Sequence, residues 1–222
     1  MIENMREVNT PRDLKMQSRK PNMTSPRSFQ LMPPIVILTT PRLRLRQWSA
    51  SDLEPWAALN SDPRVMEYFP AMLDAEASRT SRDRIVEAIE KQGWGLWAAE
   101  RLDTGAFIGF IGLQHPRFEP FLGDVEIGWR LAYEHWGQAF APEGALAALS
   151  FAFESLGLER VISMTTRPNL RSMRVMEKLG MVRVPEADFD HPRVPEGHPL
   201  RRHVLYTLER ADLVKSVRSI SP

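Results

Sequence analysis

Residues 125–143 combine a strand, a small-residue loop and a helix start in an order that favours anion binding. The apolar run 125–131 predicts a strand, and Gly137 precedes a run of helix formers. A glycine lets the backbone approach a ligand closely, and the first amides of a helix have no intrahelical acceptor. With the positive end of the helix dipole, these amides suit a pyrophosphate. Because a glycine before a helix is also common in ordinary turns, this segment alone identifies no ligand.

Composition limits the chemistry that can accompany such a site. The chain has 222 residues, of which 43% are hydrophobic and 26% charged, as in ordinary soluble globular proteins. It has 0 cysteines, which excludes a disulfide framework, a thiolate zinc site and a cysteine acyl-enzyme. The phosphate loop and the glycine triplet of nucleotide-dependent enzymes are also absent from the sequence.

Charge is distributed unevenly along the chain. Residues 1–34 carry six basic and three acidic side chains of the 29 and 28 in the whole chain, so the remainder has a net charge of −2. A nucleic-acid-binding core would be more basic. No apolar run reaches the roughly 18 residues of a membrane helix. We therefore expect a cytoplasmic protein that binds neither nucleic acid nor a membrane.

Residues 1–36 contain several prolines and no sustained apolar period, so we expect a disordered or loosely docked extension. A basic arm for an acidic partner is the alternative. Beyond it, Ser51–Glu54 has the form of a capping box that opens a helix, and Arg42, Arg44 and Arg46 are expected to point outward from a first strand.

Hydrophobic periodicity then predicts the following elements. They are a strand at 42–47, helices at 52–60 and 75–92, strands at 94–100, 106–113 and 125–131, a helix at 141–155, a strand at 161–166, a helix at 169–179, and strands at 182–184 and 203–208. This order predicts an α+β domain over residues 37–213, with a largely antiparallel central sheet flanked by helices, and a tail at 214–222.

Two motifs about 30 residues apart are more specific than the loop alone. Gly137 and Ala139 fit the pattern Gln/Arg-x-x-Gly-x-Gly/Ala, from which Glu134 departs, and residues 169–180 contain Asn-x-x-Ser followed by Glu-Lys-Leu-Gly. Together with the opening at 38–46, they resemble the GNAT superfamily of N-acetyltransferases, most closely its ribosomal-protein-alanine acetyltransferase-like branch. The resemblance covers about residues 37–210.

The resemblance implies acetyl-CoA as cosubstrate, no metal, and an amine-bearing acceptor, either a protein N-terminus or a small molecule. An amine must lose a proton before it attacks a thioester. Without cysteine, direct attack in a ternary complex is the natural route. Glu126 is the expected general base, Ser172 the expected hydrogen-bond donor to the thiolate or cofactor, and Tyr206 a candidate general acid. The expected cofactor contacts are Trp129, Leu131, Gly137, Gln138, Ala139, Phe140, Ala141 and Asn169.

Each assignment has a structural alternative. Glu126 is otherwise a solvent-facing or arginine-paired strand carboxylate, Ser172 and Asn169 stabilise the start of their own helix, and Tyr206 is a core residue. The aromatic residues Trp129 and Phe140 are otherwise core residues. For the whole chain, the alternative is a non-catalytic acyl-CoA-binding module, which the departure at Glu134 supports.

Acceptor recognition is expected from the helices at 52–92 and the loop at 185–202. The basic loop residues Arg193, His198, Arg201 and Arg202 indicate an acceptor with negative groups near its amine. The histidine and aspartate spacings in this loop fit no standard metal site. Two interpretations remain open for Arg167, Arg171 and Arg174. They either contact the CoA phosphates or form a solvated helix face. A monomer or homodimer is expected.

Overall fold

The computed structural model describes residues 32–213, which form nine strands, four α-helices and four short 3-10 helices. The predicted extension up to residue 31 and the tail at 214–222 lie outside the described residues. The strands are β1 (Leu38–Thr39), β2 (Leu43–Arg46), β3 (Leu96–Arg101), β4 (Phe107–Gln114), β5 (Glu126–Leu131), β6 (Arg160–Thr166), β7 (Val182–Arg183), β8 (Phe189–Asp190) and β9 (Arg202–Glu209). The α-helices are α1 (Leu53–Ser61), α2 (Ala75–Gln92), α3 (Phe140–Glu154) and α4 (Leu170–Lys178). The 3-10 helices are η1 (Ala50–Asp52), η2 (Tyr133–His135), η3 (Pro185–Ala187) and η4 (Arg210–Asp212).

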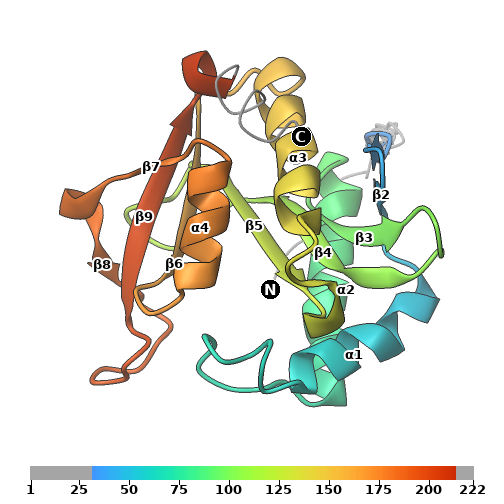
Figure 1. The fold of residues 1–222 in the computed structure, drawn as a ribbon, viewed down its shortest axis with the longest axis horizontal. Coiled ribbons are helices and arrows are strands. Elements are labelled where there is room, and N and C mark those ends of the chain that lie inside the picture. Colours follow the sequence, from blue (N-terminus) through green and yellow to red (C-terminus); the bar gives the residue numbers. More distant parts are fainter. Residues whose placement is uncertain (1–31, 214–222) are drawn as a thin grey trace, which may run out of the picture. The chain divides into compact units, whose positions relative to one another are not determined.

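The described strands form one sheet in the order β1-β2-β3-β4-β5-β6-β9-β7, with β8 also paired to β9 (Figure 1). Every pairing in this part of the chain is antiparallel except that of β5 with β6. The predicted α+β class with a largely antiparallel sheet is therefore confirmed. α3 connects the two parallel strands, as a parallel pair requires a crossover.

β5 and β6 are paired only near their starts. Their ladder contains one residue pair, Glu126 with Ile162, after which the Ser163 hydroxyl donates to the Ile127 carbonyl at 2.9 Å. Beyond this point the strands spread apart in a V, which opens downward in Figure 1. The edge of β5 that faces β6 therefore lacks a strand partner from Gly128 onward, within the residues described.

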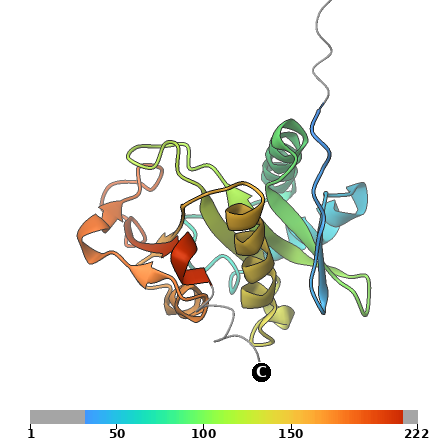
Figure 2. The same cartoon turned by 90° about the horizontal axis from the view of Figure 1, so that it is seen from above.

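Helices cover both faces of the sheet. α3 and α4 pack on one face, around Leu149, Phe153 and Met176, whereas α1 and α2 pack on the other, around Trp56 and Ile89. Figure 2 shows α3 and α2 on opposite sides of the strands. Fully burying one such side chain contributes roughly 1.5–3 kcal/mol. None of the described helices is long and apolar enough to cross a membrane.

Local signals define α2 as predicted. Asp74 caps its start by accepting from the Ala77 amide at 2.8 Å, and Gly93 ends it with a left-handed φ of 82°. Residues 33–36, which the sequence assigns to the extension, pack beside this end. The Val36 amide donates to the Gly93 carbonyl at 2.8 Å, and the Trp97 indole donates to the Val36 carbonyl at 2.8 Å.

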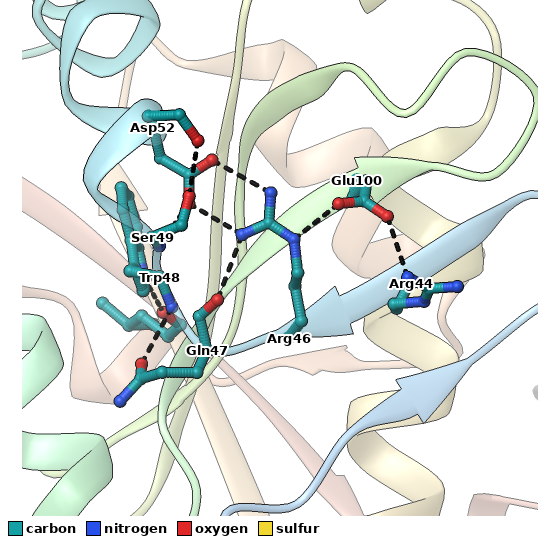
Figure 3. Close-up of polar contacts among 9 residues, drawn as sticks. Arg44, Arg46, Gln47, Trp48, Ser49, Asp52 and Glu100 are labelled. Carbon is teal, nitrogen blue, oxygen red and sulfur yellow. Dashed lines mark hydrogen bonds and ion pairs between the residues drawn. The ribbon is translucent and has the colours of Figure 1, made fainter.

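The predicted capping box at Ser51–Glu54 is wrong by two residues. The Asp52 carboxylate accepts from the Ser49 amide at 2.7 Å, so the capping contact belongs to η1, which runs directly into α1. Asp52 turns this way because Arg46 holds its carboxylate through two hydrogen bonds of 2.7 and 2.9 Å (Figure 3). A tertiary contact therefore decides which of two adjacent sequence matches forms the cap.

Arg46 was expected to point outward, but it links two carboxylates at the end of β2. Its guanidinium pairs with Glu100 at 2.6 Å as well as with Asp52, and Glu100 also reaches Arg44 (Figure 3). The Asp52 side chain is only 2% exposed. Burial alone would raise the pKa of Asp52, but hydrogen bonds from Arg46 and the Ser49 amide outweigh it and lower that pKa below 3.8.

We predict that Asp52→Asn destabilises the fold by about 2–4 kcal/mol at pH 7, because it removes one partner from a buried ion pair. The effect should depend on pH. A carboxylate with a depressed folded-state pKa contributes stability above its unfolded pKa and loses it as pH falls through the folded value. Urea unfolding at pH 7 and pH 3 should therefore show the difference shrinking in acid.

The matched control is Asp62→Asn, which removes the exposed ion pair of Asp62 with Arg64 at 2.6 Å. A surface pair of this kind contributes little to stability. An equal loss of stability in the two variants would show that the ion pair of Arg46 with Asp52 contributes no more than a solvated surface pair.

Candidate active site

The space between the diverging strands is a cavity of about 660 Å³. It is bounded by β5, β6, the starts of α3 and α4, and the segment between α1 and α2. That segment contributes Val65, Tyr68, Phe69 and Pro70, and the loop before β9 contributes residues between 191 and 200. A volume in this range is typical of small-molecule and cofactor sites.

A loop with two left-handed residues lies at the start of α3. Gly137 has a φ of 73°, and Ala139, at 61°, is the one non-glycine residue with a positive φ between residues 32 and 213. Such turns aim successive backbone amides in one direction, and the first turn of α3 adds amides without intrahelical acceptors. The Trp136 indole secures the loop by donating to the Leu131 carbonyl at 2.8 Å. The loop therefore has the backbone geometry of an anion-binding site.

Seven of the eight predicted cofactor contacts line the cavity, and Gln138 does not. The Gln138 side chain is exposed and donates to the Glu134 carbonyl at 2.9 Å, away from the cavity lining. Glu134 thus supports the loop through its carbonyl, while its carboxylate, which departs from the family motif, is exposed. The seven lining residues are Trp129, Leu131, Gly137, Ala139, Phe140, Ala141 and Asn169.

Glu126 lies at the apex of the V, and its side chain lines the cavity. The Gln114 amide donates to Oε2 of Glu126 at 2.8 Å. Burial raises the pKa of Glu126 to about 7, although hydrogen bonds from Gln114 and the Met164 amide lower it. No cation of residues 32–213 pairs with this carboxylate, so the arginine-paired alternative is not found. A carboxylate with a pKa near 7 is suited to accept a proton at neutral pH.

Asn169 and Ser172 line the cavity and also stabilise the start of α4. Asn169 caps the helix, since its Oδ1 accepts from the Ser172 amide at 3.2 Å. Its Nδ2 donates to the hydroxyls of Thr165 and Ser172 at 3.0 and 3.1 Å. Because the Ser172 oxygen accepts from Asn169, its hydroxyl hydrogen can be donated toward the cavity. The predicted structural and chemical roles are therefore compatible in one arrangement.

Tyr206, the candidate general acid, does not line the cavity. Its ring is buried in the layer under α3 and α4, and its hydroxyl donates to Oε1 of Glu177 at 3.2 Å. Burial, followed by the nearby Glu177 charge, raises its pKa. The period of two along β9 explains the placement, because Val204 and Leu208 enter the same apolar layer.

The basic residues of the 185–202 loop are already engaged with the protein. Arg201 and Arg202 pair with Asp190 at 3.5 and 3.4 Å, and Arg193 donates to the Arg117 carbonyl at 3.4 Å. These contacts weaken the prediction that the loop supplies free cations to an acceptor.

His191 and His203 face each other in the cavity wall, with ring centroids 4.8 Å apart. Burial lowers the pKa of both, that of His191 to about 4. Over residues 32–213, no three His, Cys, Asp or Glu side chains are placed to hold a metal ion.

Arg171 joins two walls of the cavity. It forms an ion pair with Glu67, from the segment between α1 and α2, and lies over the Trp136 ring at 5.0 Å. Of the three arginines considered for phosphate contacts, Arg171 and Arg174 line the cavity and Arg167 does not.

Arg130 is a cavity residue that sequence analysis did not single out. It lies on the same face of β5 as Glu126, with Gly128 between them, because alternate residues of a strand share a face. The available signal was this alternation within an apolar run. Arg130 was missed because residues 125–131 were interpreted only as a strand that leads into a loop, and the side chains were not assigned to the two faces of that strand.

The fold and cavity define an α+β protein with a cavity between two diverging parallel strands and, at the start of α3, a loop with the backbone geometry of an anion-binding site. Residues 42–182 match the acetyltransferase (GNAT) domain family, and the chain belongs to this family. Membership implies acetyl transfer from acetyl-CoA. The family resemblance found in the sequence is therefore confirmed.

Relatives cover most of the folded domain. The chain is 32% identical over 151 residues to the uncharacterized N-acetyltransferase YoaA of Bacillus subtilis, covering 65% of this chain and 81% of that protein. It is 29% identical over 192 residues to FsC-acetyl coenzyme A-N(2)-transacetylase of Aspergillus fumigatus, covering 80% and 78%. A crystal structure of a GNAT-family acetyltransferase from Bacillus anthracis superposes with a TM-score of 0.66 at 26% identity, covering 79% of this chain and 99% of that one.

We predict that Ala139→Gly stabilises the protein by about 0.5–1 kcal/mol, because a left-handed φ costs an L-residue roughly 1–2 kcal/mol and a flexible glycine in the unfolded chain returns only part of that. Thermal and urea unfolding measure the change. Ala141→Gly, two residues later in the right-handed first turn of α3, is the control and should destabilise. A loss of stability in both variants would contradict the strain at Ala139.

Proposed function

We propose that this protein transfers the acetyl group of acetyl-CoA to a primary amine by direct attack within a ternary complex. The acceptor is a small-molecule amine or a protein N-terminus. The observation that supports this most strongly is Glu126, an unpaired carboxylate with a raised pKa at the apex of the cavity. The names of two relatives, an N-acetyltransferase and an N(2)-transacetylase, are consistent with an amine acceptor.

The cofactor would lie along the open edge of β5. Its pyrophosphate would accept hydrogen bonds from the amides of residues 137–141, at the positive end of the α3 dipole. Its pantetheine arm would occupy the V and satisfy the peptide groups that β6 leaves unpaired. The thioester would then point toward Glu126, where the two strands meet.

Glu126 would accept the proton of the attacking ammonium, directly or through one water. An α-amine has a pKa of about 7.7–8.0, so a base of pKa near 7 is well matched to it. The amine nitrogen then forms a bond to the acetyl carbon, the bond from that carbon to the CoA sulfur breaks, and the nitrogen gives up its second proton to become an amide. The Ser172 hydroxyl, which lines the cavity, would donate a hydrogen bond to the departing thiolate, and the thiolate would take up the proton that the nitrogen releases. The Tyr206 hydroxyl has no part in this scheme.

The alternative of a non-catalytic acyl-CoA-binding module drew its support from Glu134. In the structure, Glu134 contributes a carbonyl to the loop and leaves the amides of Gly137 and Ala139 in place. Its departure from the family motif is therefore compatible with cofactor binding and turnover. Release of free CoA thiol from acetyl-CoA with a panel of amines separates the two functions.

We predict that Glu126→Gln lowers kcat about 100-fold at pH 7, the usual order for loss of a general base. The loss should shrink at pH 9–10, where the amine deprotonates in solution. In the wild-type enzyme, kcat should rise with pH through an apparent pKa near 7, and this limb should vanish in the variant. A full-speed variant would remove Glu126 from the mechanism.

Stability provides an independent check on Glu126. Because its folded-state pKa is raised, ionisation destabilises the folded protein as pH rises above about 4.5. Glu126→Gln should therefore have a higher Tm than wild type at pH 8 and a similar Tm at pH 4. Identical Tm differences at both pH values would show that the carboxylate is not desolvated.

We further predict that Gly137→Val lowers acetyl-CoA affinity by at least about tenfold in calorimetry, since the valine side chain would occupy open space over the anion-binding loop. Gly105→Val is the matched control. Gly105 has a φ of 70°, similar to the 73° of Gly137, and also open surroundings, but it lies in the turn between β3 and β4. Both variants carry the same backbone strain, so reduced affinity in both would contradict the cofactor placement.

A further inference from the structure

Arg130 lines the cavity wall and has no anionic partner among the residues that the structure describes. Within the part of the chain that the structure describes, its guanidinium makes one hydrogen bond, from Nη1 to Oδ1 of Asn60 at 2.6 Å, and its Nε is buried without an acceptor. Among residues 32–213 it forms no ion pair, and desolvation alone lowers its pKa to about 10. Burying a charge in this way is unfavourable unless a partner of opposite charge arrives.

A buried polar chain holds the guanidinium in place. Asn60 and Ser78 are both 0% exposed, and Nδ2 of Asn60 donates to the Ser78 hydroxyl at 3.1 Å. This contact directs Oδ1 of Asn60 toward Arg130. The arrangement links α1, α2 and β5, so the position of the guanidinium is specified by the core on this face of the sheet.

Aromatic rings surround the same guanidinium. It lies 4.0 Å from the Phe69 ring centroid and 5.2 and 5.8 Å from those of Trp56 and Phe110. Rings stabilise a cation without neutralising it. They also exclude water, which strengthens a charge–charge contact with a ligand.

Arg130 and Glu126 belong to one continuous wall. They lie four residues apart on the same face of β5, which corresponds to about 13 Å between Cα atoms in an extended strand. Between them, Gly128 lines the cavity, and a Cβ placed there would meet no atom within 4 Å. The two charged groups are therefore separated by open space along the strand.

We infer that Arg130 binds a carboxylate of the acceptor, so that the substrate is an amino acid-like molecule whose amine and carboxylate are several bonds apart. This inference rests on the proposed function, because it places the acceptor amine at Glu126. A carboxylate matches the planar guanidinium in charge and geometry. A single unneutralised arginine among aromatic rings suits a monoanion better than a phosphate dianion.

The assignment differs from the expectation that loop arginines meet the acceptor. Arg201 and Arg202 share Asp190, and Arg171 pairs with Glu67. In contrast, Arg130 retains donors for a ligand.

The test compares matched amines with and without a carboxylate. Binding of 4-aminobutyrate and 6-aminohexanoate, each against the alkylamine of equal chain length, is measured by calorimetry in the presence of free CoA. Wild type should bind an aminocarboxylate at least about tenfold more tightly than its partner amine. Arg130→Met should abolish this preference while CoA affinity, measured on the same samples, reports an intact fold.

Two further variants control the result. Arg130→Lys keeps the charge but loses the planar fork, so it should retain part of the preference. Arg84→Met makes the same substitution at an exposed arginine of α2 and should leave the preference unchanged. Equal binding of both amine classes by wild type, or an undiminished preference in Arg130→Met, would overturn the inference.

Turnover separates this inference from the proposed function. If neither amine class is acetylated although the carboxylate preference is present and lost in Arg130→Met, the subsite stands and the proposed function fails. If both classes are acetylated and bound equally, the proposed function stands and the subsite is wrong.

Discussion

The separation of β5 from β6 after one residue pair is the constraint on which the rest of this structure depends. Peptide groups along an open strand edge need partners, and a continued ladder would have supplied them. Neighbouring strands keep the opening fixed. β4 pairs with β5 from Gln114–Glu126 to Gly109–Leu131, and β9 pairs with β6 along its whole length. α3 then crosses between the two strands and brings its amino end to the mouth of the V.

Desolvation in this opening acts on two groups of opposite charge. It raises the pKa of Glu126 and lowers that of Arg130, because burial disfavours the charged form of each. Neither is neutralised by a counter-ion within the described chain. Such uncompensated groups in a cavity are characteristic of sites that complete their interactions with a ligand. Both groups lie on the same face of β5, so the proposed base and the proposed anion subsite follow one another along the strand.

Sequence reasoning recovered the features that depend on local interactions. The bounds of α2 follow from Asp74 and Gly93, and the Asn169 cap marks the start of α4. It failed where a distant contact decided the outcome. Arg46 selects the cap at Ser49 from a different element, and Tyr206 faces the core because of how β9 sits in the sheet. Arg130 could have been found from the period of two along β5, but its isolation depends on which side chains surround it, and periodicity does not report that.

The ion pair of Arg171 with Glu67 couples the two sides of the cavity. Glu67 belongs to the segment that also carries Phe69, whereas Arg171 belongs to the first turn of α4, beside the proposed cofactor groove. A ligand that drew Arg171 away from Glu67 would release the segment of Glu67 and Phe69 from its tie to α4, and by thermodynamic reciprocity the cost of that release would lower the affinity for the ligand. One ion pair would in this way couple a ligand beside α4 to the segment on the opposite wall of the cavity.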